Sequence, residues 1–291
     1  MNDYVQNDYL HYEGKTAVVT GAASGIGRAT AQRLVELGAE VHAIDYAPTE
    51  LPGLASATQA NLAIREDIDR AFAALPEHID TFFGVAGVSG LQHDYNTTLL
   101  INFGAYKYLS KTHLEPRMSD GGAIAYVTSV GGVNWERYQE ELEELIQADG
   151  WDAIVETIEG LGLQDQPGPA AYALSKRLLN LFMAHSATEL ASRGIRVNAV
   201  LPTNTETGLT PDFAVMRGGR DLLEANAGLN NRLAVPEEMA DPLVFLNSYA
   251  ARYISGQPLV VDFGARNLQL LGRKEDRLDC PLIAGTQTAR A

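Results

Sequence analysis

The sequence predicts an α/β fold, a doubly wound seven-stranded parallel sheet with helices on both faces. Short apolar segments alternate with segments of helical periodicity through most of the 291 residues, as in parallel sheets with helical crossovers. The first apolar segment, residues 15–20, runs directly into a glycine-rich turn at 21–27. One acidic segment of helical periodicity, about residues 133–169, interrupts the alternation after the fifth expected strand.

The composition excludes several classes of partner. The formal net charge is −15, so nucleic acid and anionic membrane surfaces would be repelled. No apolar run approaches the roughly 18 residues that span a membrane, and residues 1–13 lack the apolar centre of a signal peptide. Cys280 is the single cysteine and cannot form an internal disulfide, which fits a reducing compartment. We therefore expect a soluble, cytoplasmic protein with neither a nucleic-acid nor a membrane partner.

The beginning of the chain has the pattern of a dinucleotide-binding unit. The strand at 15–20 leads into Gly21, Gly25 and Gly27, and residues 28–37 have helical spacing. Glycines let the backbone approach a pyrophosphate, and a helix N-terminus supplies free N–H groups and a positive dipole end. The alternative is a tight turn that binds nothing.

The second expected strand, residues 40–44, ends at Asp45. An acid at this distance from the glycines can bond both hydroxyls of the adenosine ribose, and it would repel the 2′-phosphate of NADP. Tyr46 adds no positive charge. The sequence therefore predicts NAD as the cofactor, against the alternative of an ordinary loop carboxylate.

The later segments continue the alternation of strand and helix. Further strands are expected up to residue 62 and at 81–86, 122–129, 195–201 and 257–262, and helices at about 65–75, 98–115, 172–193, 221–230 and 236–247. Ser129 ends the strand at 122–129. Ligands of open parallel sheets bind at the carboxyl ends of the strands, so Ser129 is expected at the site.

Tyr172 and Lys176 stand four residues apart in an expected helix. Residues with this spacing share one helix face, so the ammonium can lie close to the phenol. A nearby cation favours the phenolate and lowers the tyrosine pKa. Such a pair can take the proton of an alcohol as a hydride leaves the same carbon. The alternative is an exposed polar helix face.

With these motifs in this order, residues 14–264 resemble the short-chain dehydrogenase/reductase family, which has a Rossmann-type fold. The resemblance implies a four-residue catalytic site. Tyr172 would be the general acid/base, and Ser129 would hold the substrate oxygen. Lys176 would bind the nicotinamide ribose and lower the tyrosine pKa, and Asn102 would hold a water that links Lys176 to solvent. The family is usually dimeric or tetrameric, so a homodimer or homotetramer is expected.

The resemblance also implies a set of cofactor contacts and no metal. The contacts are Gly21, Ser24, Gly25, Ile26, Gly27, Asp45, Asn61, Leu62, Ala86, Gly87, Lys176, Pro202, Thr205 and Thr207. Where the family has Asn-Asn-Ala-Gly, this chain has Gly84, Val85, Ala86 and Gly87. The first two amide side chains are therefore missing, which bears on cofactor affinity rather than on the chemistry.

The acidic segment at about 133–169 predicts two amphipathic helices inserted between the fifth strand and the helix that carries Tyr172. We expect a single NAD-binding domain over residues 1–291, with this insertion and a C-terminal extension at 265–291. The insertion could wall the substrate, block the dimer face that the helix of Tyr172 usually supplies, or be neutral. An insertion here resembles bacterial 3α-hydroxysteroid dehydrogenase/carbonyl reductases.

The loop after Thr207 contains apolar side chains that could close over a bulky substrate: Leu209, Phe213, Val215 and Met216. The function expected is NAD-dependent interconversion of a secondary alcohol and a ketone on a bulky apolar substrate, first a hydroxysteroid. Two alternatives are a dehydrogenase for another cyclic, terpenoid or aromatic alcohol, and a non-catalytic NAD-sensing protein.

Overall fold

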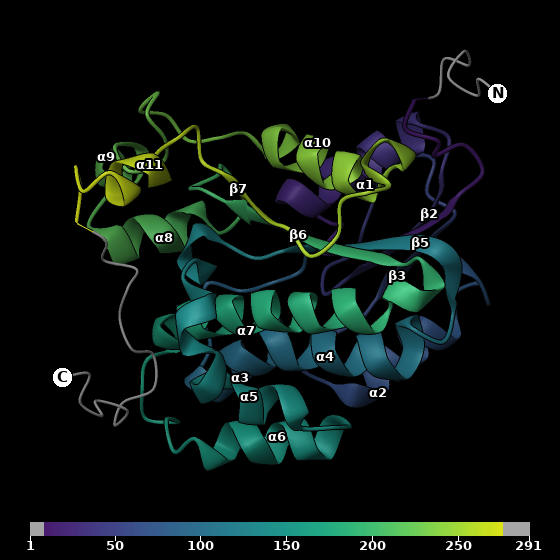
Figure 1. The fold of residues 1–291 in the computed structure, drawn as a ribbon, viewed down its shortest axis with the longest axis horizontal. Helices are drawn as coiled ribbons and strands as arrows, with labels where there is room; N and C mark the ends of the chain where they lie inside the picture. Colours follow the sequence, from purple (N-terminus) through teal and green to yellow (C-terminus); the bar gives the residue numbers. More distant parts are fainter. Residues whose placement is uncertain (1–8, 276–291) are drawn as a thin grey trace.

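A computed structural model describes residues 9–275, and its centre is one seven-stranded sheet (Figure 1). All neighbouring strands are parallel, and their order is β3-β2-β1-β4-β5-β6-β7. The strands are β1 Thr16–Thr20, β2 Glu40–Asp45, β3 Ser56–Gln59, β4 Ile79–Gly84, β5 Met118–Val127, β6 Arg196–Pro202 and β7 Pro258–Val261. The predicted doubly wound sheet is confirmed. Chain order reverses between β1 and β4, where such sheets place their ligand crevice.

Helices cover both faces of the sheet because successive strand side chains point to opposite faces. The helices on one face are α1 Gly25–Glu36 and α10 Pro236–Asn247; those on the other are α2 Arg65–Ala73, α4 Ala105–Leu109 and α7 Gly168–Glu189 (Figure 1). Val18 belongs to the core under α2, α4 and α7, and Val19 to the core under α1 and α10. No helix among residues 9–275 is both long and apolar enough to cross a bilayer.

The helix between β4 and β5 is longer than predicted and is interrupted by two π turns. It consists of α3 Tyr95–Leu99, η2 Leu100–Gly104, α4 and η3 Ser110–Leu114. It begins three residues before the predicted Thr98 because the carboxylate of Asp94 caps it, accepting the N–H of Thr97 at 2.7 Å. Asn102 lies in the first π turn.

The predicted insertion helices are confirmed as α5 Gln139–Gln147 and α6 Trp151–Gly160. They pack on the side of α4 and α7 that faces away from the sheet (Figure 1). Their apolar faces are buried in the main core, as at Leu145 and Ile154. Gly104 gives the room: a Cβ there would lie 2.9 Å from Ile154 Cγ2. The insertion therefore covers helix surface that would otherwise be exposed.

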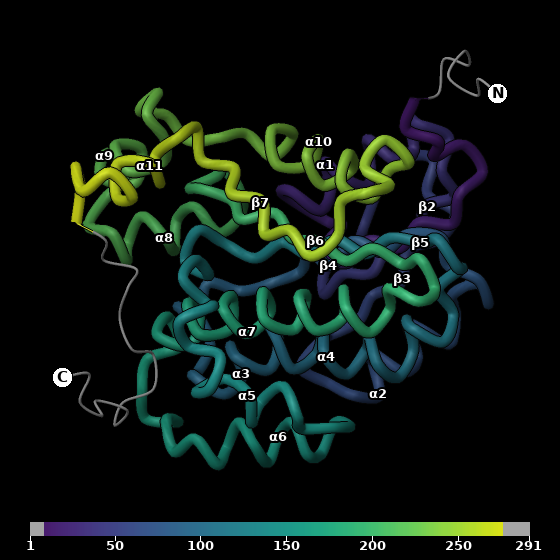
Figure 2. The backbone as a smooth tube through the Cα atoms, in the orientation of Figure 1, coloured from purple at the N-terminus to yellow at the C-terminus, as the bar shows by residue number. Residues whose placement is uncertain are grey.

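The largest departure from the sequence prediction is after Thr207, where a loop was expected. The structure has a helix, α8 Thr210–Arg217, with Pro211 in its first turn and Gly218 ending it at φ +85°. The helix expected at 221–230 is only α9 Arg220–Glu224. A final helix, α11 Arg266–Leu270, follows β7 (Figure 2), and Lys274 beyond it donates to the side-chain oxygen of Asn226 just beyond α9. Cys280 and most of the C-terminal extension lie outside the described residues.

Candidate active site

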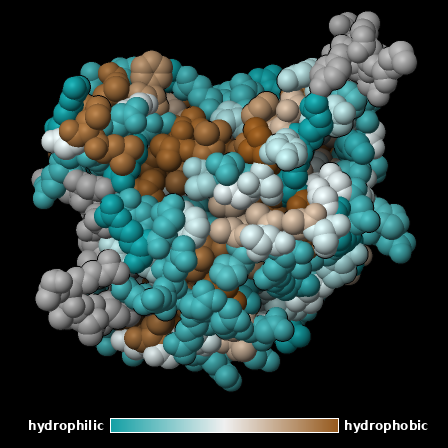
Figure 3. Space-filling model, viewed as in Figure 1, coloured by the Kyte–Doolittle hydropathy of each residue, from teal (hydrophilic) through white to brown (hydrophobic). Residues whose placement is uncertain are grey.

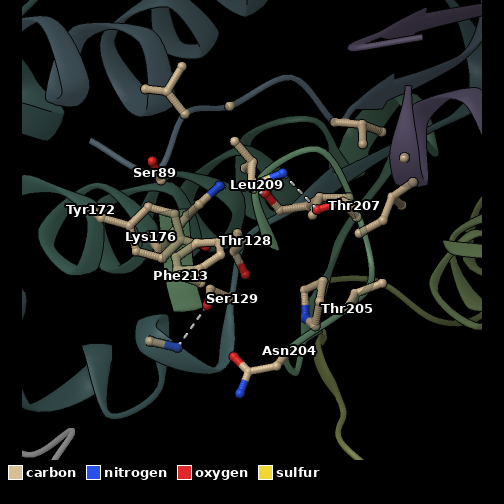
Figure 4. A pocket seen from close by; sticks show the side chains of 18 of the residues that line it. Ser89, Thr128, Ser129, Tyr172, Lys176, Asn204, Thr205, Thr207, Leu209 and Phe213 are labelled. Atoms are coloured by element: carbon tan, nitrogen blue, oxygen red, sulfur yellow. Dashed lines mark hydrogen bonds between the residues drawn. The ribbon is translucent and has the colours of Figure 1, made fainter. Parts of the chain in front are cut away.

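A cavity of about 1210 Å³ opens at the carboxyl ends of the strands. Its lining includes every residue of the expected cofactor set, from Gly21 to Thr207, and three of the four expected catalytic residues, Ser129, Tyr172 and Lys176. Figure 4 shows the end of this cavity where Tyr172, Lys176 and Ser129 lie together. The fold thus brings the loop after β1 and the loop after β6, which are far apart in the sequence, to the same cavity.

The glycine-rich turn lets the first strand, its helix and the loop after β4 come into contact. Gly21 has φ +74°, and a Cβ there would lie 2.7 Å from the amide nitrogen of Ala86. A Cβ on Gly27 would lie 2.0 Å from the carbonyl oxygen of Gly21. Because neither position has room for a side chain, the N-terminus of α1 remains open to the cavity, and its N–H groups can receive an anionic group.

Asp45 lies in the cavity wall at the end of β2. Its carboxylate accepts the N–H of Ala23 at 2.9 Å and that of Ala47 at 2.8 Å, which fixes it beside the glycine turn. The lysines and arginines that line the described cavity are Lys176, Arg217, Arg266 and Lys274. None of these comes from the turn or from the strand ends around Asp45. A fixed negative charge therefore dominates the end of the cavity where an adenosine ribose is expected.

Asn61 is more constrained than the sequence indicated. Its side-chain oxygen accepts the N–H of Ala63 at 2.9 Å, and its own N–H donates to Asp67 at 2.9 Å. The expected bond from an adenine amino group would have to share that side-chain oxygen. Asn61 and Leu62 follow β3 rather than forming its end.

Two buried tyrosines fill the space that a side chain at Gly84 would need. A Cβ on Gly84 would lie 2.6 Å from the ring of Tyr126 and 2.8 Å from that of Tyr106. The Tyr106 hydroxyl donates to the carbonyl of Ala86 at 2.8 Å and lies 2.9 Å from the hydroxyl of Thr20. Thr20 in turn accepts the N–H groups of Val85 and Ala86. The loop after β4 is therefore held by a tyrosine and a threonine.

Tyr172, in the second turn of α7, has its hydroxyl bonded by Ser129 and its ring packed against Phe213. The Phe213 ring stands edge-on at 5.3 Å between centroids. Ser129 lies two residues beyond the end of β5, and its hydroxyl also accepts the N–H of Gly131 at 3.0 Å. These three side chains and Leu209 surround the same point of the cavity (Figure 4).

The expected lowering of the Tyr172 pKa by Lys176 is wrong for this arrangement. Burial raises the pKa of the Tyr172 phenol, and the hydrogen bond of Ser129 and the charge of Arg217 lower it less. Burial also lowers the pKa of Lys176 to about 8. The ammonium donates to the carbonyl of Val127 at 3.1 Å and lies 5.5 Å from the centre of the Tyr172 ring. Its contact is with the face of the ring rather than with the hydroxyl.

Asn102 does not line the cavity but lies fully buried behind it. Its side-chain oxygen accepts the N–H of Val88 at 2.8 Å, and its amide donates to the carbonyl of Val88 at 3.0 Å. The amide is therefore occupied with the backbone of the loop. The expected water relay at Asn102 stays a prediction.

The sequence did not indicate the contact that fixes α8 over the cavity. Ser89, buried in the loop after β4, donates its hydroxyl to the carboxylate of Asp212 on α8. The two residues are separated by 123 positions, so no local pattern could link them. The insertion helices, by contrast, contribute nothing to the lining of the described cavity, so they do not wall the substrate. No group of three metal-ligating side chains occurs within residues 9–275.

Known proteins match nearly the whole chain. The short chain dehydrogenase family matches residues 15–140, and a family described as enoyl-(acyl carrier protein) reductase matches residues 139–266. A coniferyl-alcohol dehydrogenase from Pseudomonas sp. is 32% identical over 260 residues, covering 88% of this chain and 98% of the relative.

Two solved structures have the same fold. The 3-alpha-hydroxysteroid dehydrogenase of Pseudomonas sp. B-0831, complexed with NADH, aligns with a TM-score of 0.73 at 24% identity, covering 89% of this chain and 99% of the other. A putative NAD(P)-dependent gluconate 5-dehydrogenase from Beutenbergia cavernae, with bound NADP, aligns with a TM-score of 0.68 at 28% identity. The alignment covers 88% of this chain and 98% of the other.

Replacing Tyr106 by Phe tests how the loop after β4 is held. The variant leaves the carbonyl of Ala86 without its donor, so the free energy of unfolding should fall by about 1–3 kcal/mol in urea denaturation. The affinity for NAD, measured by calorimetric titration, should fall as well. Tyr126→Phe is the matched control, because it removes an equally buried hydroxyl that bonds only Ser110 at 2.8 Å. Tyr126→Phe should lower stability and leave NAD affinity unchanged. An equal loss of NAD affinity in both variants would contradict this role of Tyr106.

The buried ammonium of Lys176 should destabilise the protein below pH 8. Its pKa is about 8 when folded and 10.5 in its ordinary state, so between these values the unfolded chain binds the extra proton. Stability of the cofactor-free protein should therefore rise with pH from about 8 to 10.5 and be flat below. In Lys176→Met this rise should be absent, and the variant should be more stable at pH 7 by up to ~3 kcal/mol.

Lys15→Met is the control for this measurement. Lys15 forms an exposed ion pair with Asp80, so its replacement should change stability by less than about 1 kcal/mol. Urea denaturation of the three proteins at pH 7, 9 and 10.5 gives the comparison. A Lys176→Met variant less stable than wild type at pH 7 would mean that the bond to Val127 outweighs the cost of burying the charge.

Proposed function

The chain belongs to the short-chain dehydrogenase/reductase family, and on that premise we propose that it interconverts a secondary alcohol and a ketone with NAD as the cofactor. One observation carries the proposal. A half-buried Tyr172, bonded to Ser129 and covered by Lys176 on one ring face, lies at one end of a cavity. The glycine turn and Asp45 lie in the wall of the same cavity.

The residues present fit a dinucleotide. The glycines that exclude side chains leave room for a pyrophosphate at the N-terminus of α1, and Asp45 would hold the adenosine ribose. Lys176 would bind the nicotinamide ribose, and the loop at Thr205 and Thr207 would hold the carboxamide end. When bound, NAD supplies a hydride acceptor, and NADH supplies a hydride donor.

The chain's own residues manage the substrate oxygen and its proton. Ser129 donates a hydrogen bond to that oxygen, and Tyr172 gives the proton in ketone reduction or takes it in alcohol oxidation. Because burial raises the pKa of Tyr172, the resting group at neutral pH is the phenol, which is the donor form. Oxidation needs the phenolate, so the positive charge of Arg217, which lowers the pKa of Tyr172, favours this direction.

Asp45 is the basis for proposing NAD rather than NADP. Its carboxylate is fixed by two backbone N–H groups and faces the cavity. A 2′-phosphate placed there would meet a like charge, which costs several kcal/mol when water is excluded.

Two substrate classes suit the cavity. Leu209, Phe213 and Met216 give its reactive end apolar walls, which suits a bulky ring system, and the first candidate is a hydroxysteroid. The second is an aromatic alcohol, which is favoured by the 32% identity to a coniferyl-alcohol dehydrogenase.

We also propose that the protein self-associates away from the insertion. The insertion occupies the outer face of α4 and α7, so that face is not available as bare helix. Apolar side chains are instead exposed over α9, α11 and β7 (Figure 3). They are Leu222, Leu229, Leu259, Phe263, Leu270 and Leu271, a patch suited to contact with another subunit.

Replacing Tyr172 by Phe should abolish turnover while NAD still binds. The loss of the proton donor is expected to lower kcat by about 10²–10⁴-fold, measured as NADH formation from hydroxysteroids, coniferyl alcohol and simple cyclic alcohols. Tyr95→Phe is the control, because Tyr95 is a buried tyrosine outside the cavity lining and its hydroxyl has no hydrogen-bond partner. A Tyr172→Phe rate close to wild type would remove Tyr172 from the mechanism. If the wild type binds NAD tightly but turns over none of these alcohols, the alternative of a non-catalytic NAD-sensing protein is favoured.

Replacing Asp45 by Ser should relax the preference for NAD. Without the like charge, the ratio of kcat/KM for NAD to that for NADP should fall by about tenfold or more. Asp80→Ser is the control, since Asp80 also accepts a backbone N–H of β1, from Thr16 at 3.0 Å, but outside this cavity. A wild type that uses NADP as well as NAD would contradict the proposed selectivity directly.

A further inference from the structure

Arg217 is an arginine with no acidic partner at the reactive end of the cavity. It is the last residue of α8 and lines the cavity with Leu209, Phe213 and Met216. No hydrogen bond or ion pair joins its guanidinium to another residue within 9–275. Arg217 is exposed to solvent, so its charge is accessible to an incoming ligand. Arg220, three residues on, bonds both Glu206 and Glu224.

The position of Arg217 relates it directly to the reacting groups. Phe213 and Arg217 are four residues apart on α8 and so lie on one face of that helix, about one turn or 6 Å apart along its axis. The Phe213 ring packs on the ring of Tyr172. Arg217 therefore stands one helical turn beyond the point where a substrate oxygen would meet Tyr172, and its charge lowers the pKa of that tyrosine.

The hydrogen bonds of two acids in this region go to groups other than Arg217. Asp212 accepts the hydroxyl of Ser89. Asp262 accepts the N–H groups of Gly264 and Arg266, at 2.9 and 2.5 Å. A second cation of this lining, Lys274, donates to the side-chain oxygen of Asn226 at 2.6 Å rather than to a carboxylate. This end of the cavity thus combines apolar walls with two cations, Arg217 and Lys274, to which no carboxylate is hydrogen-bonded.

We propose that the substrate carries a carboxylate, which Arg217 binds while the alcohol or ketone carbon lies at Tyr172. A guanidinium binds a carboxylate through two parallel hydrogen bonds, and the apolar walls between would hold the body of the molecule. This inference rests on the proposed dehydrogenase activity and adds the substrate class: an apolar ring system with an acidic group, rather than a neutral alcohol. Arg217 is then a specificity-determining residue.

The test compares each acid with its neutral ester. Lithocholate and its methyl ester form one pair, and 4-(1-hydroxyethyl)benzoate and its methyl ester form another. The wild type should have the higher kcat/KM for the acid of at least one pair. Arg217→Met should lower kcat/KM for that acid by about 10–100-fold, as expected for hydrogen bonds to a charged group, and should change the ester less than twofold. The acid preference of the wild type should also weaken as NaCl is raised.

Arg232→Met is the matched control, because it removes the same charge from an exposed arginine that pairs with Glu238 outside the cavity. It should leave the acid-to-ester ratio unchanged. The ratio also cancels any effect of Arg217 on the pKa of Tyr172, which would act on acid and ester alike. Equal losses for acid and ester in Arg217→Met, or a wild type that prefers the esters, would overturn the proposal.

Calorimetric titration of the NAD-saturated protein with lithocholate separates failure of the activity from failure of the anion site. If no alcohol is turned over but lithocholate binds and Arg217→Met weakens binding at least tenfold, the anion site stands and the dehydrogenase does not. If turnover occurs and neither acid depends on Arg217, the dehydrogenase stands and the anion site is wrong. Absence of both turnover and lithocholate binding would reject both.

Discussion

Burial of the Lys176 ammonium is the constraint on which the site depends. A cation in the interior requires polar compensation, and here it has the carbonyl of Val127 and the face of Tyr172. Both contacts need α7 to cross the end of β5 closely. Gly132 permits the close approach, since a Cβ there would lie 2.8 Å from the carbonyl oxygen of Lys176. Tyr172 and Ser129 come together as a consequence, because they lie on α7 and just beyond β5.

Much of the buried polarity around the cavity holds backbone rather than substrate. Thr20, Tyr106 and Asn102 all bond the loop after β4, and Asp45 bonds the glycine turn. This fixes the cavity wall without an amide side chain at position 84 or 85. The hydroxyls of Ser129 and Tyr172 are hydrogen-bonded to each other inside the cavity. They can therefore exchange this bond for hydrogen bonds to a substrate.

The insertion and α8 have different roles: the insertion shapes the outer surface, and α8 covers the cavity. The insertion packs into the main core over α4 and α7 and does not reach the cavity, so its effect is on the outer surface and on how subunits could meet. α8 covers the reactive end: Asp212 ties it to Ser89, and Phe213 packs on Tyr172. Substrate selection thus belongs to α8, where apolar walls and the unpaired Arg217 meet.

The sequence by itself determined the α/β fold, the glycine turn, the Tyr172 and Lys176 pair and the two insertion helices. These follow from local periodicity and from spacing within one element, which neighbouring residues fix. The tertiary structure decided the rest. The pKa of Tyr172 depends on its burial, to which Phe213 of α8 contributes. The loop after β4 depends on a hydrogen bond from Tyr106 of α4, and the place of the insertion depends on which helix face had room at Gly104. Such effects depend on contacts between distant segments, which no local pattern records.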